Sequence, residues 1–117
     1  MKDQKKIHVK RIRRKARTRS RIFGTVSRPR ISVYRTNKYL YAQFIDDDAQ
    51  KTLISASTRV LENLSKDSDH EALLAEKIAE KAKSAGISKG VLDRGSYKYH
   101  GRIKKFIETL RTLGITI

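Results

Sequence analysis

Two short runs of alternating apolar and polar residues decide the fold: ISVYRT at residues 31–36 and YLYAQFI at residues 39–45. A period of two is typical of strands that have one buried face. Asn37 and Lys38 lie between the runs, and Asn tolerates the positive φ of a two-residue hairpin turn. Such a turn places Tyr34 opposite Tyr41 and predicts two contrasting faces. The core face would hold Ile31, Val33, Leu40, Ala42 and Phe44, and the polar face Ser32, Tyr34, Thr36, Tyr39, Tyr41 and Gln43.

The residues after the hairpin predict one further strand, a helix, a short strand and a last helix. Residues 46–50 (DDDAQ) indicate a solvated turn, and residues 52–58 a third strand antiparallel to the second. Ser68 and Glu71 have capping-box spacing, and Gly86 is the expected stop of the helix that follows. Val91-Leu92 is expected to pair in parallel, residues 103–110 to form a helix ended by Gly114, and residues 115–117 are a candidate edge strand. This order predicts an α/β fold: a single domain with a mixed, mainly antiparallel sheet and two helices packed mostly on one face.

Positive charge is concentrated at the N-terminus. The chain has 117 residues with 28 Lys and Arg against 12 Asp and Glu, and 13 of those cations lie in residues 1–30 with a single acid. We therefore expect a basic arm over residues 1–24 and a folded domain over residues 25–117. Like charges four residues apart, such as Lys10 and Arg14, oppose a helix in isolation. The arm is expected to be mobile when free and helical when bound to a polyanion, with nucleic acid the first candidate.

Two other features of the sequence favour RNA. The polar face of the hairpin carries Tyr34, Tyr39 and Tyr41, and exposed rings beside cations can stack on unpaired bases. Residues 93–102 (DRGSYKYHGR) combine two glycines with basic and aromatic side chains before a helix N-terminus, where free N–H groups favour an anion. Both segments suit contact with an RNA backbone.

Other classes of function are weaker alternatives. The absence of Cys excludes disulfides and thiolate sites, and no apolar run approaches the about 20 residues of a membrane span. His8, His70 and His100 lack metal-ligand spacing, so no metal, cofactor or catalytic residue is predicted. Asp46–Asp48 with Asp93 keep open a metal-dependent nuclease on a similar sheet. The basic arm keeps open a membrane-surface or calmodulin ligand.

Two long motifs resemble those of a known family. Residues 28–47 (RPRISVYRTNKYLYAQFIDD) resemble the first-hairpin signature of the bacterial-type ribosomal protein L18 family, and residues 93–102 its second signature, with Ser96 where glycine is common. The resemblance implies a non-enzymatic structural constituent of the large ribosomal subunit in the cytoplasm. It implies binding to 5S rRNA, attachment of that RNA to 23S rRNA in the central protuberance, and neighbours such as ribosomal protein L5. No membrane or small-molecule substrate is expected.

The candidate RNA contacts come from the arm, the hairpin and the second motif. They are Lys10, Arg11, Arg13, Arg14, Lys15, Arg17, Arg19, Arg21, Arg28, Arg30, Arg35, Asn37, Lys38, Tyr39, Tyr41, Arg94, Tyr97, Lys98, Tyr99, His100 and Arg102.

Overall fold

The computed structural model describes residues 2–36, 38–60, 69–95, 97 and 99–117. The elements in chain order are α1 (Lys2–Arg19), β1 (Arg30–Arg35), β2 (Leu40–Asp46), β3 (Lys51–Ser57), the 3-10 turn η1 (Thr58–Val60), α2 (His70–Ser84), β4 (Val91–Asp93) and α3 (Gly101–Thr112). The four strands form one sheet in the order β3-β2-β1-β4. The predicted α/β fold with a mixed, mainly antiparallel sheet is therefore confirmed.

The hairpin has the register that its turn predicts. Tyr34 pairs with Tyr41, and Ile31 pairs with Phe44. Asn37 lies outside the described residues, but the residues flanking the turn close it: the amide of Thr36 donates to the carbonyl of Tyr39 at 2.9 Å. The amide of Tyr39 in turn donates to the hydroxyl of Thr36 at 2.9 Å. The short loop thus fixes which side chains face the core.

The edges of the sheet follow from longer-range pairing. β4 pairs in parallel with an earlier strand, as predicted; the partner is β1, and the pairing places Asp93 beside Ser32. The C-terminal residues 115–117 contribute a single parallel bridge, between Lys89 and Thr116, rather than the full edge strand considered from the sequence. The amide of Gly90 donates to the carbonyl of Thr116 at 2.9 Å beside this bridge.

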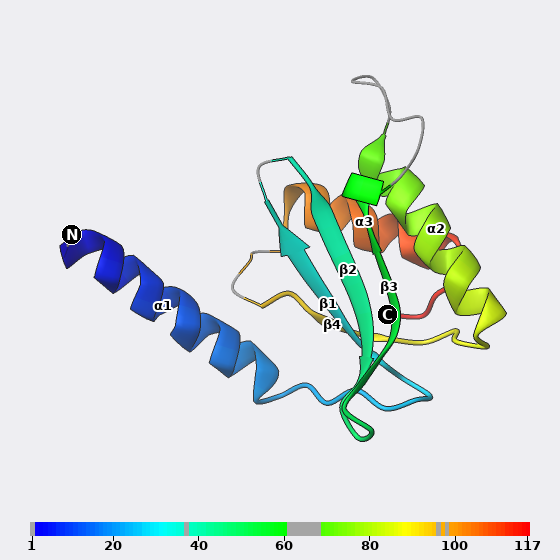
Figure 1. The fold of residues 1–117 in the computed structure, drawn as a ribbon, viewed down its shortest axis with the longest axis horizontal. Helices are drawn as coiled ribbons and strands as arrows, with labels where there is room; N and C mark the ends of the chain where they lie inside the picture. The colour runs from blue at the N-terminus through cyan, green and yellow to red at the C-terminus, as the bar shows by residue number, and fades with distance from the viewer. Residues whose placement is uncertain (1, 37, 61–68, 96, 98) are drawn as a thin grey trace.

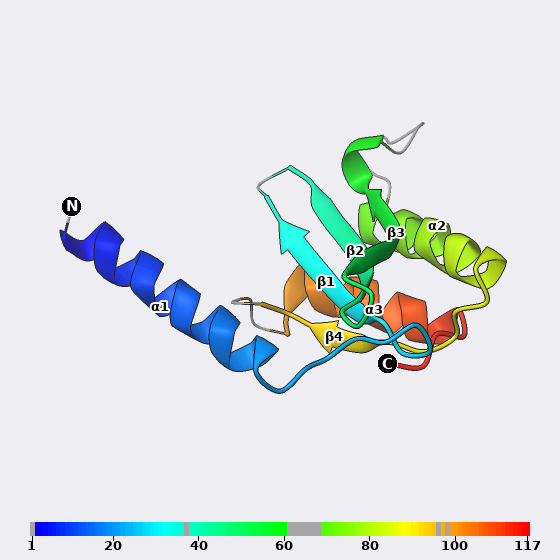
Figure 2. The ribbon, with the colours of Figure 1, turned by 60° about the horizontal axis from the view of Figure 1, so that its bottom comes forward.

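Helices α2 and α3 cover one face of the sheet, as Figure 1 shows. Each helix buries four side chains at helical spacing: Leu74, Ala75, Ile78 and Ala82 from α2, and Ile103, Phe106, Ile107 and Leu110 from α3. They pack in one cluster with the buried strand residues Ile31, Val33, Leu40, Ala42, Phe44 and Ile54. The predicted core face is confirmed, and none of the described helices packs in this way on the opposite face of the sheet (Figure 2).

The start of α2 differs from the capping box expected at Ser68, a residue that itself lies outside the described part of the chain. The N-cap is Asp69, whose carboxylate accepts the amide of Ala72 at 3.1 Å. Because the helix starts one residue later than the box requires, Glu71 stands at its second position and pairs with Arg102 instead. The end of α2 is as predicted, since Gly86 has a φ of 73° and the amide of Ile87 donates to the carbonyl of Ala82 at 2.8 Å.

The basic arm forms helix α1, the conformation predicted for its RNA-bound state. It extends away from the sheet and from α2 and α3 (Figures 1 and 2). Its apolar residues Ile7, Val9 and Ile12 are 51%, 43% and 53% exposed, so packing against the core does not explain the helix. Ordering of the arm by RNA stays a prediction.

Candidate RNA-binding surface

The described cations of α1 are solvent-exposed. This holds for Lys10, Arg11, Arg13, Arg14, Lys15 and Arg17, and also for Arg21 just beyond the helix. With 3.6 residues per turn, these positions spread over somewhat more than half of the circumference of α1, and Val9, Ile12 and Ala16 lie on the remainder. The backbone of Arg19 belongs to α1, and its side chain lies outside what the structure describes. The arm therefore presents a dense field of positive charge on several sides.

The arm is joined to the sheet at Gly24. Its amide donates to Oδ2 of Asp47 at 2.8 Å, and its carbonyl accepts the amide of Asp47 at 2.9 Å. A Cβ at this position would overlap the amide nitrogen of Arg30 and the carbonyl oxygen of Ile45, and would lie 2.8 Å from the Arg30 Cβ. Only glycine allows the backbone to approach the sheet so closely.

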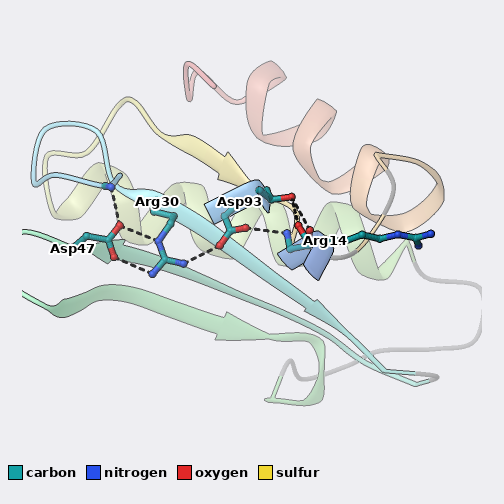
Figure 3. A network of polar contacts seen from close by, with 7 residues as sticks. Arg14, Arg30, Asp47 and Asp93 are labelled. Carbon is teal, nitrogen blue, oxygen red and sulfur yellow. Dashed lines mark hydrogen bonds and ion pairs between the residues drawn. The ribbon is translucent and has the colours of Figure 1, made fainter. Parts of the chain in front are cut away.

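Arg30 lies next to Gly24 and binds two carboxylates (Figure 3). Its Nε and Nη2 donate to Oδ2 and Oδ1 of Asp47, both at 2.9 Å, and its Nη1 donates to Oδ2 of Asp93 at 2.8 Å. The Arg30 side chain is 13% exposed, and that of Asp93 is 1% exposed. The hydrogen bond to Asp47, with a smaller contribution from Asp93, raises the pKa of Arg30, although burial opposes this. The structure thus gives this candidate RNA contact two partners within the protein.

The second motif begins directly beside this ion pair. The amide of Gly95 donates to Oδ1 of Asp93 at 2.9 Å, and the carbonyl of Gly95 accepts the hydroxyl of Thr18 at 3.1 Å. The Thr18 hydroxyl also lies 3.0 Å from the carbonyl of Arg14, within α1. The C-terminal end of α1 and the second motif are therefore in direct contact, although Thr18 and Gly95 are 77 positions apart in the sequence.

The same loop reaches the end of the hairpin. The hydroxyl of Tyr97 lies 3.3 Å from both the amide nitrogen and the carbonyl oxygen of Arg35. The Arg35 guanidinium lies 6.0 Å from the centroid of the Tyr97 ring, within range of a cation–π interaction. The structure therefore brings together three segments that are distant in sequence: the arm, the tip of the hairpin and the second motif.

Tyrosine rings lie on the sheet face that the helices leave uncovered. The rings of Tyr34 and Tyr41 are 5.9 Å apart, and those of Tyr39 and Tyr41 are 6.5 Å apart and edge to face. Tyr34 is 59% exposed, and the other two rings are partly buried. The cluster offers flat apolar surface next to cations, as base stacking requires.

Some of the remaining candidate RNA contacts are exposed, and others are bonded to residues within the protein. Arg28, Lys38, Arg94 and His100 are exposed, whereas Asn37 and Lys98 lie outside the described residues. Arg102 binds the carboxylate of Glu71 on α2. Tyr99 packs against the core and donates its hydroxyl to Glu108 at 2.9 Å. Burial, followed by the bond to Glu108, raises the pKa of Tyr99.

The acidic turn after β2 is not simply solvated. Asp46 is buried, and its Oδ1 accepts the amides of Asp48 and Ala49 at 3.0 and 3.3 Å. The predicted turn is found over residues 47–50, but Asp46 is the last residue of β2 and Asp47 binds Arg30, so only Asp48 of the three aspartates is exposed. Among the described residues, no group of three or more His, Cys, Asp or Glu side chains is placed to hold a metal ion. No described helix is both long and apolar enough to span a membrane.

Sequence reasoning missed the roles of Gly24, Asp47 and Thr18. The hairpin register could have predicted the contact of Arg30 with Asp47, because it places Arg30 opposite Ile45 and therefore close to Asp47. The contact of Arg30 with Asp93 depends on the parallel β1–β4 pairing, whose register the sequence did not specify.

Comparison with known proteins agrees with this arrangement of motifs. The family described as ribosomal L18 of archaea, bacteria, mitochondria and chloroplasts matches residues 4–117. The large ribosomal subunit protein uL18 of Clostridium botulinum strain Langeland is 46% identical over 107 residues, covering 90% of each chain. The protein of the same name from Thermotoga neapolitana is 46% identical over 111 residues, covering 91% of each chain. That of Borrelia recurrentis is 44% identical over the full length of both chains. The chain belongs to the ribosomal L18 family.

Proposed function

We propose that this protein binds 5S rRNA and attaches it to 23S rRNA in the central protuberance of the large ribosomal subunit. Membership of the ribosomal L18 family makes the chain a structural ribosomal protein and not an enzyme. The choice of 5S rRNA, of the central protuberance and of neighbours such as ribosomal protein L5 rests on the resemblance of its two motifs to the family signatures. The cytoplasm is the expected compartment of the assembled particle.

The observation that carries the proposal is the convergence of the arm, the hairpin and the second motif. Thr18 contacts Gly95, and Tyr97 contacts Arg35, so three segments rich in cations or aromatic rings form one surface. A rigid set of cations at fixed separations can follow the phosphates of one folded RNA, whereas a loose tail binds any polyanion. This arrangement supports recognition of RNA shape.

The proposed binding surface combines two kinds of contact. Exposed cations of α1, with Arg21, Arg28, Arg35, Lys38 and Arg94, would neutralise phosphates and fix the orientation of the RNA. The ring of Tyr34, with Tyr39 and Tyr41 beside it, would stack on unpaired bases or pack on ribose. Tyr97 and His100 complete the surface at the second motif. Arg30, Tyr99 and Arg102 support the fold through the bonds described above.

The division into arm and domain suggests the first experiment. Deleting residues 1–22 removes most of the excess charge and keeps Gly24, so we expect the remaining domain to fold and to bind 5S rRNA far more weakly. If about 6–10 cations meet phosphates, the affinity of the full chain falls about 10³–10⁵-fold between 50 and 200 mM salt, and that of the truncated chain much less. Filter binding at both salt concentrations measures this.

A matched variant separates charge from chain length. Changing Arg13, Arg14 and Lys15 to Gln keeps the arm and the helix propensity of these positions but removes three charges. It should lower both the affinity and the salt dependence by an intermediate amount. Unchanged affinity of the truncated chain at physiological salt contradicts the proposed role of the arm.

A further inference from the structure

We infer that Arg30 is a positioning residue for RNA binding, which fixes the direction of the arm instead of contacting the RNA. The expected effect on RNA binding rests on the proposed function, whereas the contacts of Arg30 do not depend on it. Each carboxylate that holds Arg30 also holds a backbone amide of an RNA-binding segment. Asp47 binds the amide of Gly24, at the end of the arm, and Asp93 binds the amide of Gly95, in the second motif.

These contacts form a closed ring, most of which can be followed in Figure 3. Starting from Gly24, the hydrogen bonds run through Asp47, Arg30 and Asp93 to Gly95. The carbonyl of Gly95 then accepts the hydroxyl of Thr18, which is joined to Gly24 by only five residues of chain. The base of the arm is therefore held at two points. A helix held only at Thr18 could swing about that contact, and the second attachment at Gly24, just beyond the end of α1, restricts this motion.

The guanidinium is suited to this task in a way that an ammonium group is not. Its planar fork donates two hydrogen bonds to Asp47 and a third, from another nitrogen, to Asp93. Lys at this position keeps the charge but is a single point donor and loses the fixed angle between the two carboxylates. Since Arg30 is 13% exposed and lies next to Gly24, little of its guanidinium remains available to a phosphate.

Fixing the arm matters because α1 carries a large share of the positive charge far from the sheet. An arm whose base is already held loses less conformational freedom when RNA orders it than an arm joined to the domain by the chain alone. A substitution that keeps the charge but loosens the ring should therefore weaken specific binding. Binding to a shapeless polyanion such as heparin depends on charge alone and should change little.

The test compares Arg30→Lys with Arg111→Lys. Arg111 also binds a carboxylate, that of Glu108, but lies on α3 and outside the proposed RNA surface. Both variants keep the net charge. The chain has no Cys, so Val9→Cys on α1 and Ser88→Cys after α2 provide two unique spin-label sites. Distances between the labels report the direction of the arm in the free protein by pulsed electron spin resonance.

We expect Arg30→Lys to broaden the distance distribution and to lower the affinity for 5S rRNA about tenfold, while heparin affinity stays within about twofold. Arg111→Lys should change none of these. A distribution as narrow as that of the unsubstituted chain overturns the inference, and so does a broadened one with unchanged 5S rRNA affinity. Equal loss for heparin and 5S rRNA also overturns it, because that pattern identifies Arg30 as a direct charge contact.

Thr18→Val opens the same ring without touching Arg30 or the net charge. It should broaden the distribution in the same way, and if Arg30→Lys does not fold, an unchanged distribution in Thr18→Val overturns the inference. Failure of the proposed function has a different signature. In that case the unsubstituted chain shows no preference for 5S rRNA over heparin, while the spin-label distances still report whether the ring directs the arm.

Discussion

The hydroxyl of Tyr97 lies 3.3 Å from both backbone polar atoms of Arg35, a residue 62 positions earlier in the chain. Arg35 is the last residue of β1, where its backbone would otherwise face water at the end of the β1–β2 ladder. The tyrosine both accepts and donates there, and so fastens the second motif to the tip of the hairpin. Together with the contact of Thr18 with Gly95, it makes one surface of three segments.

Tyr97→Phe should loosen this attachment without emptying the space that the ring fills. Two hydrogen bonds at a solvent-exposed site are lost, so we expect the free energy of unfolding to fall by about 0.5–1.5 kcal/mol. Affinity for 5S rRNA should fall by more than this small loss of stability alone would cause. The reason is that the loosened second motif carries Arg94, one of the proposed phosphate contacts. Urea denaturation and filter binding measure the two effects, and an affinity equal to that of the unsubstituted protein contradicts a role for this contact in binding.

Tyr34 provides a test of the aromatic face. Its side chain is 59% exposed, so Tyr34→Ala removes little buried surface, and the main loss to the fold is the contact with Tyr41. A ring stacked on a base contributes about 1–3 kcal/mol, so the affinity for 5S rRNA should fall about 5- to 150-fold. Tyr34→Phe keeps the ring and serves as the control. Equal, small effects of the two substitutions contradict stacking at this position.

The N-cap of α2 predicts a dependence of stability on pH. The Lys105 ammonium, 2.9 Å from Asp69, and the amide of Ala72 lower the pKa of this carboxyl below its ordinary value of 3.8. A lowered native pKa means that the carboxylate stabilises the fold fully above the ordinary pKa and that this stabilisation is lost as pH falls through the native value. Asp69→Ala should therefore cost about 1 kcal/mol at pH 7 and progressively less below pH 3.8.

Asp69→Asn separates the two contributions to this cap. Its amide oxygen still accepts the amide of Ala72, but the charge that attracts Lys105 is gone, so the loss of stability at pH 7 should be smaller than for Asp69→Ala. Thermal unfolding followed by circular dichroism from pH 2 to 7 measures the differences. A difference between Asp69→Asn and the unsubstituted protein that does not shrink on acidification contradicts the assignment of the lowered pKa.

Local patterns in the sequence predicted much of the fold. A two-residue turn between alternating runs fixed the register of β1 and β2, and with it the buried face from Ile31 to Phe44. Gly86 marked the end of α2, because glycine adopts the positive φ that closes a helix at low cost. These features depend on neighbouring residues and are therefore readable from the chain alone.

Features that depend on tertiary packing were not predicted. Ser and Asp are both good N-caps, so the sequence alone does not decide between Ser68 and Asp69; the N-cap of α2 is Asp69. The network around Arg30 joins residues 24, 30, 47 and 93, which come together only when β4 pairs with β1 and Gly24, at the end of the arm, lies against the sheet. A count of charges treats Arg30 like any other cation of the arm, whereas burial and pairing with two acids give it a different role.

The most direct test of the central claim is the affinity of the full chain for a 5S rRNA transcript, measured against an unrelated structured RNA of the same length. At 150 mM salt, with heparin as competitor, general attraction between charges is weakened and shape recognition remains. We predict that 5S rRNA binds at least about a hundredfold more tightly than the unrelated RNA. Equal affinity for the two RNAs would contradict the account.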